Sequence, residues 1–214
     1  MSTPMRPHVT INCATSADGK MASPDGAPLA ISSREDFARV HRLRAASDAI
    51  LVGVGTILAD DPSLVVKEEF VKGAKNPLRV VLDSNGRIPD GARVLDGRAK
   101  TVIFTAEGCA KVWNGAEALR AGKARVNLEK VLDALGNLGV KRLMVEGGGT
   151  VIREFLRLRL ADEVKVFVGE MVVGGNGPSL AKVGGIRDIA STVKLKLART
   201  TQMPGGVLLE YERG

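Results

Sequence analysis

The stretch best suited to holding a charged ligand is Leu143–Thr150, in which Glu146 is followed by three glycines. Apolar residues precede the acid, and the apolar residues after Thr150 recur at helical spacing. The pattern predicts a buried strand, a tight glycine turn and a helix that begins at Thr150. Glycines let a backbone approach a ligand closely, and a helix N-terminus presents unpaired N–H groups to an anion such as pyrophosphate. The alternative is an ordinary strand–turn–helix corner, and this stretch alone does not separate the two.

A second corner with chemical groups is Gly53–Pro62, where a strand again runs into glycine, a hydroxyl and two carboxylates. The glycines at 53 and 55 resemble the start of a dinucleotide fingerprint, but Leu58 occupies the place of its third glycine. The usual dinucleotide motif is therefore absent.

Two arginines outside these corners could bind an anionic ligand. Ser32-Ser33-Arg34-Glu35 has the form of a capping box with Ser32 as the cap, and the helix that it starts carries Arg44. Arg44 lies near the apolar stripe, either as a snorkelling edge residue or as a cation that points into a crevice. A third polar turn, Ser84–Arg87, follows the strand Leu78–Asp83 with a hydroxyl, an amide and a guanidinium.

The elements that must position these groups are mainly strands. Nearly continuous apolar runs are typical of strands covered on both faces of a parallel sheet, whereas alternation is typical of strands with one buried face. The first kind predicts strands at 49–54, 78–83 and 101–105, and the second at 8–14 and 163–168. Helical spacing predicts a helix over 128–138 and a short, weakly amphipathic one within 107–125, and residues 64–67 are expected to be extended. Alternation at 193–197 and 207–211 around Pro204-Gly205-Gly206 predicts a terminal antiparallel hairpin.

Composition limits the class of protein. With 214 residues, 44% of them hydrophobic, the chain can bury a core as one domain or at most two small ones. The order of strands and helices then predicts a single α/β domain over 1–214, with a mixed, mostly parallel sheet flanked by helices and a loose N-terminus at 1–7. The net charge of +7 favours acidic ligands, but 3% aromatic residues and the absence of a long basic run argue against nucleic acid. Two cysteines and two histidines lack metal-ligand spacing. Without a long apolar segment or a signal-peptide core, we expect no membrane partner and a cytosolic location.

Several stretches together follow the pattern of one family. They are Ser16-Ala17-Asp18-Gly19-Lys20, His41-Arg42-Leu43-Arg44-Ala45, Gly55-Thr56-Ile57-Leu58-Ala59-Asp60-Asp61-Pro62-Ser63-Leu64 and Val145-Glu146-Gly147-Gly148-Gly149-Thr150. In this the chain resembles the riboflavin-biosynthesis reductases, in particular the stand-alone, archaeal-type 2,5-diamino-6-ribosylamino-4(3H)-pyrimidinone 5′-phosphate reductases, and the reductase half of the bifunctional bacterial deaminase–reductase. The zinc-deaminase motif is absent. The resemblance implies a dihydrofolate-reductase-like fold and a homodimer.

The resemblance also assigns residues. Those that match cofactor-binding positions are Ala14, Thr56, Asp60, Ser84, Gly147, Gly148, Gly149, Thr150 and Val151, and those that match substrate-binding positions are Arg44, Leu64, Lys67 and Glu146. The segment Ala30–Ser33 falls where the family approaches the nicotinamide. Lys67 replaces an arginine of the bacterial enzymes, so a bidentate phosphate contact becomes a point charge, and Pro28 replaces a serine. No catalytic proton donor and no metal ligand is assigned.

The implied reaction is reduction by NADPH of the ribosylamino group of a pyrimidine ribosyl 5′-phosphate to the ribitylamino form, with NADH as the alternative cofactor. Whether the pyrimidine is the 2,5-diamino or the deaminated form is left open. From spacing we add Arg87 as a contact to the ribose phosphate of NADPH; the alternative is a solvated arginine in an ordinary polar turn. A pterin reductase of the same fold is the chief alternative function, and a non-enzymatic nucleotide- or RNA-binding module is a more distant one.

Overall fold

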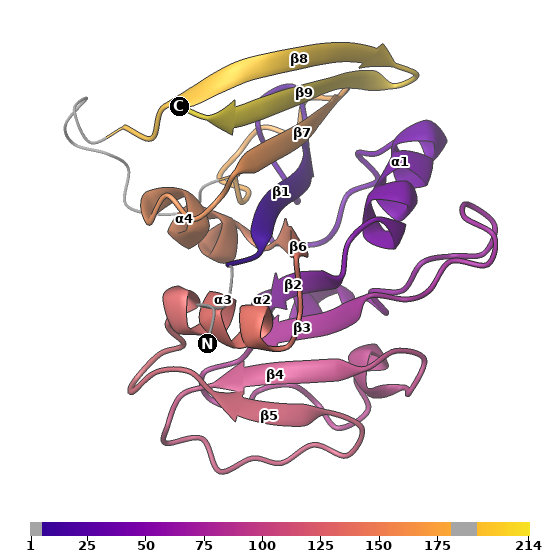
Figure 1. Ribbon diagram of the computed structural model, residues 1–214. Helices are drawn as coiled ribbons and strands as arrows, with labels where there is room; N and C mark the ends of the chain where they lie inside the picture. The colour runs from indigo at the N-terminus through magenta and orange to yellow at the C-terminus, as the bar shows by residue number, and fades with distance from the viewer. Residues whose placement is uncertain (1–5, 181–191) are drawn as a thin grey trace. The chain divides into compact units, whose positions relative to one another are not determined.

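The computed structural model describes residues 6–180 and 192–214 (Figure 1), and the chain divides into two units. Unit 1 comprises residues 1–8 and 41–144, and unit 2 comprises residues 9–40 and 145–214. Helix α1 (Arg34–Ala45) and strand β6 (Arg142–Gly147) contribute residues to both units. Of the N-terminal segment predicted to be loose, residues 1–5 lie outside the described residues.

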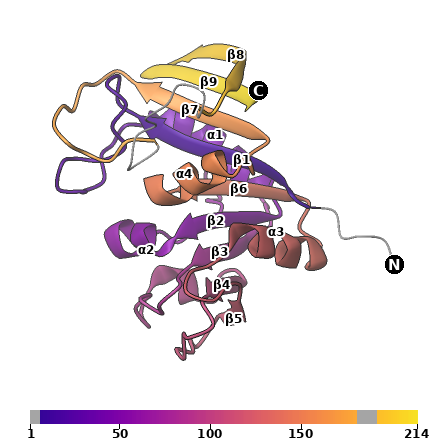
Figure 2. The same ribbon diagram turned by 90° about the vertical axis from the view of Figure 1, so that its left-hand side faces the viewer.

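Unit 1 contains the parallel strands β2 (Ala49–Gly53), β3 (Leu78–Leu82), β4 (Thr101–Thr105) and β5 (Glu117–Arg120), which are paired in the order β5-β4-β3-β2. β2 and β4 are buried along their whole length, as expected for apolar strands covered on both faces. Helix α2 (Val54–Asp60) begins directly after β2 (Figure 2), and η1 (Arg93–Leu95) is a short 3-10 turn.

Helix α3 (Leu128–Asn137) lies against the strands of unit 1 in both ribbon views (Figures 1 and 2). Its cap is Asn127, whose side-chain oxygen accepts a hydrogen bond of 3.0 Å from the Lys130 N–H. Leu128, Val131, Leu132 and Leu135 form its buried face, which confirms the predicted helical period.

Unit 2 contains β1 (His8–Thr15) from Val9 onward, β7 (Glu163–Gly169), β8 (Leu195–Met203) and β9 (Gly206–Arg213), and helix α4 (Gly149–Arg157). β1 pairs with β7 in parallel, whereas β7 with β9 and β9 with β8 are antiparallel. The predicted mixed, mostly parallel sheet and the terminal hairpin are therefore confirmed.

Three local predictions are wrong. No helix lies within 107–125; that segment holds the strand β5, whose residues are mostly exposed and so lack an apolar period. The cap of α1 is Ser33 and not Ser32, because Ser33 Oγ accepts from the Asp36 N–H at 3.2 Å, while Ser32 donates to the Asp36 carboxylate at 2.6 Å. Helix α4 begins at Gly149, one residue before the predicted start.

Candidate functional site

The predicted site residues are divided between the two units. Unit 1 holds Arg44, Thr56, Asp60, Leu64, Lys67, Ser84 and Arg87; unit 2 holds Ala14, Glu146, Gly147, Gly148, Gly149, Thr150 and Val151.

The turn between β6 and α4 is built from three consecutive glycines. Gly147 has φ +125°, a conformation that L side chains rarely adopt, so this position needs glycine. Gly148 is the N-cap of α4 at φ −36°, and no side chain caps the helix. The amides of Val151 and Ile152 donate to the Gly148 carbonyl, at 2.9 and 3.1 Å. Because glycine has no side chain, the N-cap residue itself supplies no side-chain acceptor to the first turn of α4.

Two further predicted residues of unit 2 lie on strands. Glu146 is half-buried at the carboxyl end of β6, between the buried Val145 and Gly147. Ala14, also half-buried, is paired with Phe167 of β7. On the same strand, burial raises the pKa of the Cys13 thiol to about 12. This cysteine is therefore not a thiolate nucleophile at neutral pH.

Helix α2 carries Thr56, which is half-buried, and Asp60, which is exposed. Desolvation by the surrounding protein raises the pKa of Asp60, although its exposure to solvent limits the effect. Asp61 ends the helix in the left-handed conformation, and its carboxylate accepts from the Arg93 N–H at 2.8 Å.

The substrate positions of unit 1 converge on the segment Asp61–Lys67, which forms no strand. Arg44 Nη1 donates to the Val65 carbonyl at 3.1 Å, so this arginine contacts the segment directly. The Lys67 N–H donates to His41 Nδ1 at 3.1 Å, and His41 stacks on Phe70 with centroids 4.8 Å apart. Arg44 and Lys67 are thus both tied to one short piece of backbone.

Leu64 and Lys67 differ in what they offer to a ligand. Leu64 has φ +50° and only 1% of the residue is exposed, so it shapes the segment from within and offers no accessible surface to a ligand. The Lys67 side chain is exposed, and its Nζ lies 3.6 Å from the Glu69 carboxylate. The lysine is therefore placed to offer a solvent-accessible point charge.

The turn after β3 is organised by a buried acid. Asp83 is fully buried and its Oδ2 accepts from the Ile88 N–H at 2.9 Å, so it points into the fold. Ser84 Oγ accepts from the Val126 N–H at 3.1 Å. A cavity of about 340 Å³ adjoins this turn; it is lined by Ser84, Asn85, Ala106, Gly108, Cys109, Ala110, Lys111, Lys123 and Ala124. Arg87 is exposed and does not line that cavity.

Two residues that sequence reasoning did not select take part in unit 1. Arg79 of β3 is fully buried, and its guanidinium reaches the Ser63 carbonyl in the segment Asp61–Lys67. His41 is 2% exposed and orients the backbone of Lys67. An arginine within an otherwise apolar strand is a visible signal for the first, whereas the role of His41 depends on residues 26 positions away.

The described part of the chain contains neither a cluster of metal-ligand side chains nor a membrane-spanning helix. Within it, no group of three or more His, Cys, Asp or Glu side chains is placed to hold a metal ion. Nor is any helix among residues 6–180 and 192–214 long and apolar enough to cross a membrane.

Comparison with known proteins decides the family. A family model described as the RibD C-terminal domain matches residues 7–209. The chain belongs to this family. It is 41% identical over 213 residues to the 2,5-diamino-6-ribosylamino-4(3H)-pyrimidinone 5′-phosphate reductase of Methanothermobacter thermautotrophicus, and the match covers 97% of the chain and 98% of that protein.

Solved structures agree with this membership of the RibD C-terminal domain family. A diaminohydroxyphosphoribosylaminopyrimidine deaminase/5-amino-6-(5-phosphoribosylamino)uracil reductase from Thermotoga maritima is similar with a TM-score of 0.84 and 29% identity, over 98% of this chain and 57% of that one. Dihydrofolate reductase from Enterococcus faecalis has a TM-score of 0.52 at 10% identity, over 97% and 96% of the two chains. The latter likeness concerns the fold alone, and it confirms the predicted dihydrofolate-reductase-like fold.

Proposed function

We propose that the chain reduces 2,5-diamino-6-ribosylamino-4(3H)-pyrimidinone 5′-phosphate to its ribitylamino form with NADPH, as a step of riboflavin biosynthesis. The observation that carries this proposal is the 41% identity, over nearly the whole of both chains, to a reductase of that name. Identity to a relative does not by itself assign residues, so the roles below rest on the geometry of each unit.

The segment Asp61–Lys67 supports a phosphorylated substrate. Arg44 donates a hydrogen bond to its Val65 carbonyl, and Lys67 is its last residue, with an N–H that donates to His41 Nδ1. In the proposed site these two cations hold the substrate phosphate, and the buried Leu64 shapes the segment that carries Lys67. A guanidinium and an ammonium suit a phosphate better than they suit an uncharged pterin ring.

The turn Gly147–Gly149 fits a nicotinamide dinucleotide. Its three glycines carry no side chain that would occupy the space of a pyrophosphate, and they lead into the N-terminus of α4. Thr56 and Asp60 of α2 and Ala14 of β1 are the further proposed cofactor contacts. When bound, the nicotinamide supplies the hydride. The chain's own work is then to position two anionic ligands, and Glu146 orients the polar groups of the substrate.

The cavity beside Ser84 favours NADPH over NADH. Among the described residues that line it none is acidic, so it lacks the carboxylate that typically holds both ribose hydroxyls of NADH. It holds two lysines instead. Lys111 is already engaged, since its Nζ donates to the Ile88 carbonyl at 2.6 Å and lies 3.0 Å from the Asp90 carboxylate. Lys123 is therefore the proposed cation for the ribose phosphate, alongside the exposed Arg87.

Cofactor preference is tested by measuring NADPH and NADH dissociation constants for Lys123→Ala and Arg87→Ala. Loss of one charge-assisted contact should weaken NADPH roughly tenfold and leave NADH unchanged. Arg125→Ala is the control for Lys123→Ala, because Arg125 lies on the same loop as Lys123 without lining the cavity, whereas Arg87→Ala tests the contact inferred from sequence spacing. Equal effects of a variant on both cofactors would place the ribose phosphate elsewhere.

The reaction is tested by following the absorbance of NADPH with the 2,5-diamino ribosylaminopyrimidine phosphate, its deaminated counterpart and dihydrofolate as separate substrates. We expect oxidation with the first and none with dihydrofolate. Oxidation with dihydrofolate alone would make the chain a pterin reductase of the same fold. No oxidation with any of them would leave only a nucleotide-binding module. A preference for the deaminated compound would change the substrate and keep the reaction.

We also propose a homodimer and a cytosolic location. Both cysteines, Cys13 and Cys109, are unpaired, as is usual in a reducing compartment. The strand β8 supports the dimer, because among the described residues it has β9 as its sole sheet neighbour.

A further inference from the structure

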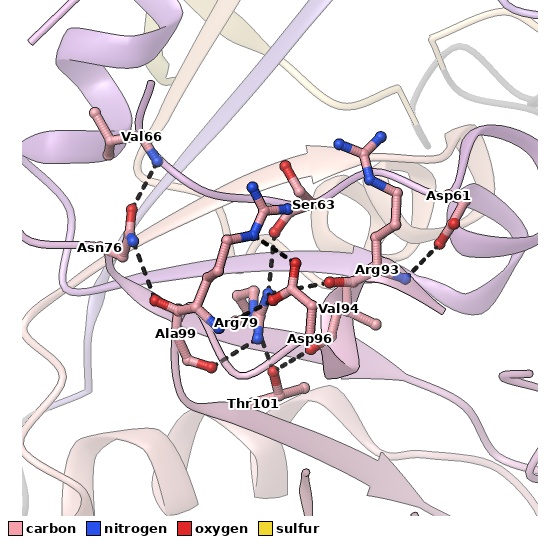
Figure 3. Close-up of polar contacts among 11 residues, drawn as sticks. Asp61, Ser63, Val66, Asn76, Arg79, Arg93, Val94, Asp96, Ala99 and Thr101 are labelled. Atoms are coloured by element: carbon pink, nitrogen blue, oxygen red, sulfur yellow. Dashed lines mark hydrogen bonds and ion pairs between the residues drawn. The ribbon is translucent and has the colours of Figure 1, made fainter. Parts of the chain in front are cut away.

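Arg79 is a fully buried cation in the middle of unit 1. It lies on β3, where the residues that follow it are apolar, and it faces acceptors on every side of its guanidinium (Figure 3). Nε donates to Thr101 Oγ1 at 2.9 Å and Nη2 to the Ala99 carbonyl at 2.6 Å, whereas Nη1 reaches Asp96 Oδ1 at 2.8 Å and the carbonyls of Arg93 and Ser63 at 3.2 and 3.3 Å.

Stability of the sheet does not by itself call for an arginine here. Burying a guanidinium removes its hydration, and a well-packed apolar residue often stabilises such a site as well or better. Strands covered on both faces of a parallel sheet are ordinarily apolar. What an apolar residue cannot supply is a rigid, planar set of donors that fixes several backbone carbonyls at once.

One of those carbonyls belongs to Ser63, in the middle of the segment Asp61–Lys67. The next residue is Leu64, a buried leucine held at φ +50°. Such a conformation persists only where the surroundings over-determine it. Asn76 fixes the segment two residues beyond Leu64, because its Oδ1 accepts from the Val66 N–H at 2.9 Å (Figure 3). The segment pairs with no strand, so side chains take the place of a ladder.

We propose that Arg79 and Asn76 are positioning residues for substrate binding. They hold the left-handed turn at Leu64 from the two sides, and this sets the direction in which the chain delivers Lys67 to the phosphate of the substrate. The proposal rests on the proposed function, which gives Leu64 and Lys67 their substrate role.

The experiment compares three variants for urea unfolding, kcat, the KM for the ribosylaminopyrimidine phosphate and the Kd for NADPH. Arg79→Lys keeps the charge and loses the fork that reaches Ser63. Asn76→Ala removes the second anchor. Thr101→Val is the matched control, because it takes the acceptor from Nε and leaves the Nη1 contacts to the segment in place.

We expect Arg79→Lys and Asn76→Ala each to raise the KM by roughly tenfold with little change in kcat or in NADPH affinity. Thr101→Val should lose stability and keep its KM. A folded Arg79→Lys protein with an unchanged KM would overturn the proposal, as would a Thr101→Val protein with an equal rise. If Arg79→Lys does not fold, Asn76→Ala decides alone, with a raised KM in support and an unchanged KM against.

Failure of the proposed function is recognised separately. A wild-type protein that does not turn over the ribosylaminopyrimidine phosphate refutes that function before any variant is compared. Trypsin cleavage after Lys67, followed by mass spectrometry, then reports the position of the segment without a substrate. Faster cleavage there in Arg79→Lys and Asn76→Ala than in Thr101→Val supports the anchoring role, and equal rates in all three refute it.

Discussion

At the scale of single residues, the adjacent glycines Gly147 and Gly148 have different requirements. Gly147 is held at φ +125°, so Gly147→Ala should destabilise the fold by roughly 1–3 kcal/mol through backbone strain. Gly148 has φ −36°, outside the left-handed region that requires glycine, so we expect the fold to tolerate Gly148→Val better than Gly147→Ala. Its side chain would enter the space proposed for the pyrophosphate, and we expect NADPH affinity to fall at least roughly tenfold.

Urea unfolding and cofactor titration of the two variants check this pair. Unchanged NADPH affinity in a folded Gly148→Val protein would return the turn to an ordinary strand–turn–helix corner. The pair is informative because neighbouring substitutions separate a backbone requirement from a ligand requirement.

Arg44 donates a hydrogen bond to the Val65 carbonyl and is also proposed to bind the substrate phosphate. Arg44→Ala should raise the KM for the phosphorylated substrate by roughly one to two orders of magnitude, since losing a charge-assisted pair costs about 1.5–3 kcal/mol. NADPH affinity should stay near its wild-type value. Arg42→Ala is the control, because Arg42 is an exposed cation in the same turn of α1. If substrate and cofactor weaken equally, the contact of Arg44 with the Val65 carbonyl is purely structural.

At the scale of elements, the connection from η1 to β4 should respond to acid. Burial opposes ionisation of Asp96, but hydrogen bonds from Arg79 and Arg98 outweigh it and lower the pKa of Asp96 to about 2. A depressed folded-state pKa stabilises the protein above the ordinary value of 3.8, and the contribution is lost as the pH falls toward about 2.

Unfolding free energy measured from neutral pH down to pH ~2 should therefore decline below pH ~4. Asp96→Asn should make this decline shallower without abolishing it. Asp18 in unit 2 should contribute to the decline in the same direction. Hydrogen bonds from Ser16 and from the amides of Val173 and Gly174 lower its pKa to about 2. A decline of unaltered slope in Asp96→Asn would contradict the assignment.

The sequence predicted correctly those strands and helices that have a buried apolar face. The apolar runs of β2, β3 and β4 and the period of α3 reflect burial directly, and the structure has them within one or two residues. β5 was missed because an exposed edge strand leaves no apolar pattern. The cap of α1 was misplaced by one residue because Ser32 and Ser33 are both competent caps, and only the register of the helix separates them.

The candidate site was predictable where it is local in sequence. Glycine turns and charged loops stand out as short motifs, and the family resemblance names their residues. The anchors of the segment Asp61–Lys67 are different, because Arg79, Asn76 and His41 approach it from 10 to 26 residues away. Side-chain to backbone contacts over such separations depend on tertiary packing, which periodicity does not record.

At the scale of the whole molecule, the net charge of +7 agrees with a reaction between two phosphorylated ligands. A cationic surface raises the local concentration of anions and speeds their encounter, and it does so without regard to the chemistry that follows. Selectivity among anionic ligands must therefore come from side chains held at defined positions. The proposed roles of Lys123 and of the segment Asp61–Lys67 are the ones to test directly.

The edge strand β8 predicts that the chain forms a dimer. β8 lies at the edge of the sheet in unit 2, most of its residues are exposed, and Leu197 on it is 52% exposed. An edge strand that, among residues 6–180 and 192–214, has one sheet neighbour and carries an exposed leucine is a template for pairing with another copy. We expect sedimentation equilibrium at micromolar concentration to give a dimer of the 22.6 kDa chain.

Leu197→Lys should shift that dimer toward monomer, because a charge on the edge opposes pairing. Val112→Lys is the matched control, since Val112 is 83% exposed but lies in unit 1, away from β8 in sequence and sheet. A wild-type monomer would remove the dimer altogether. A dimer that resists Leu197→Lys but yields to Val112→Lys would move the interface to unit 1, and the edge of β8 would then need another explanation for staying uncovered.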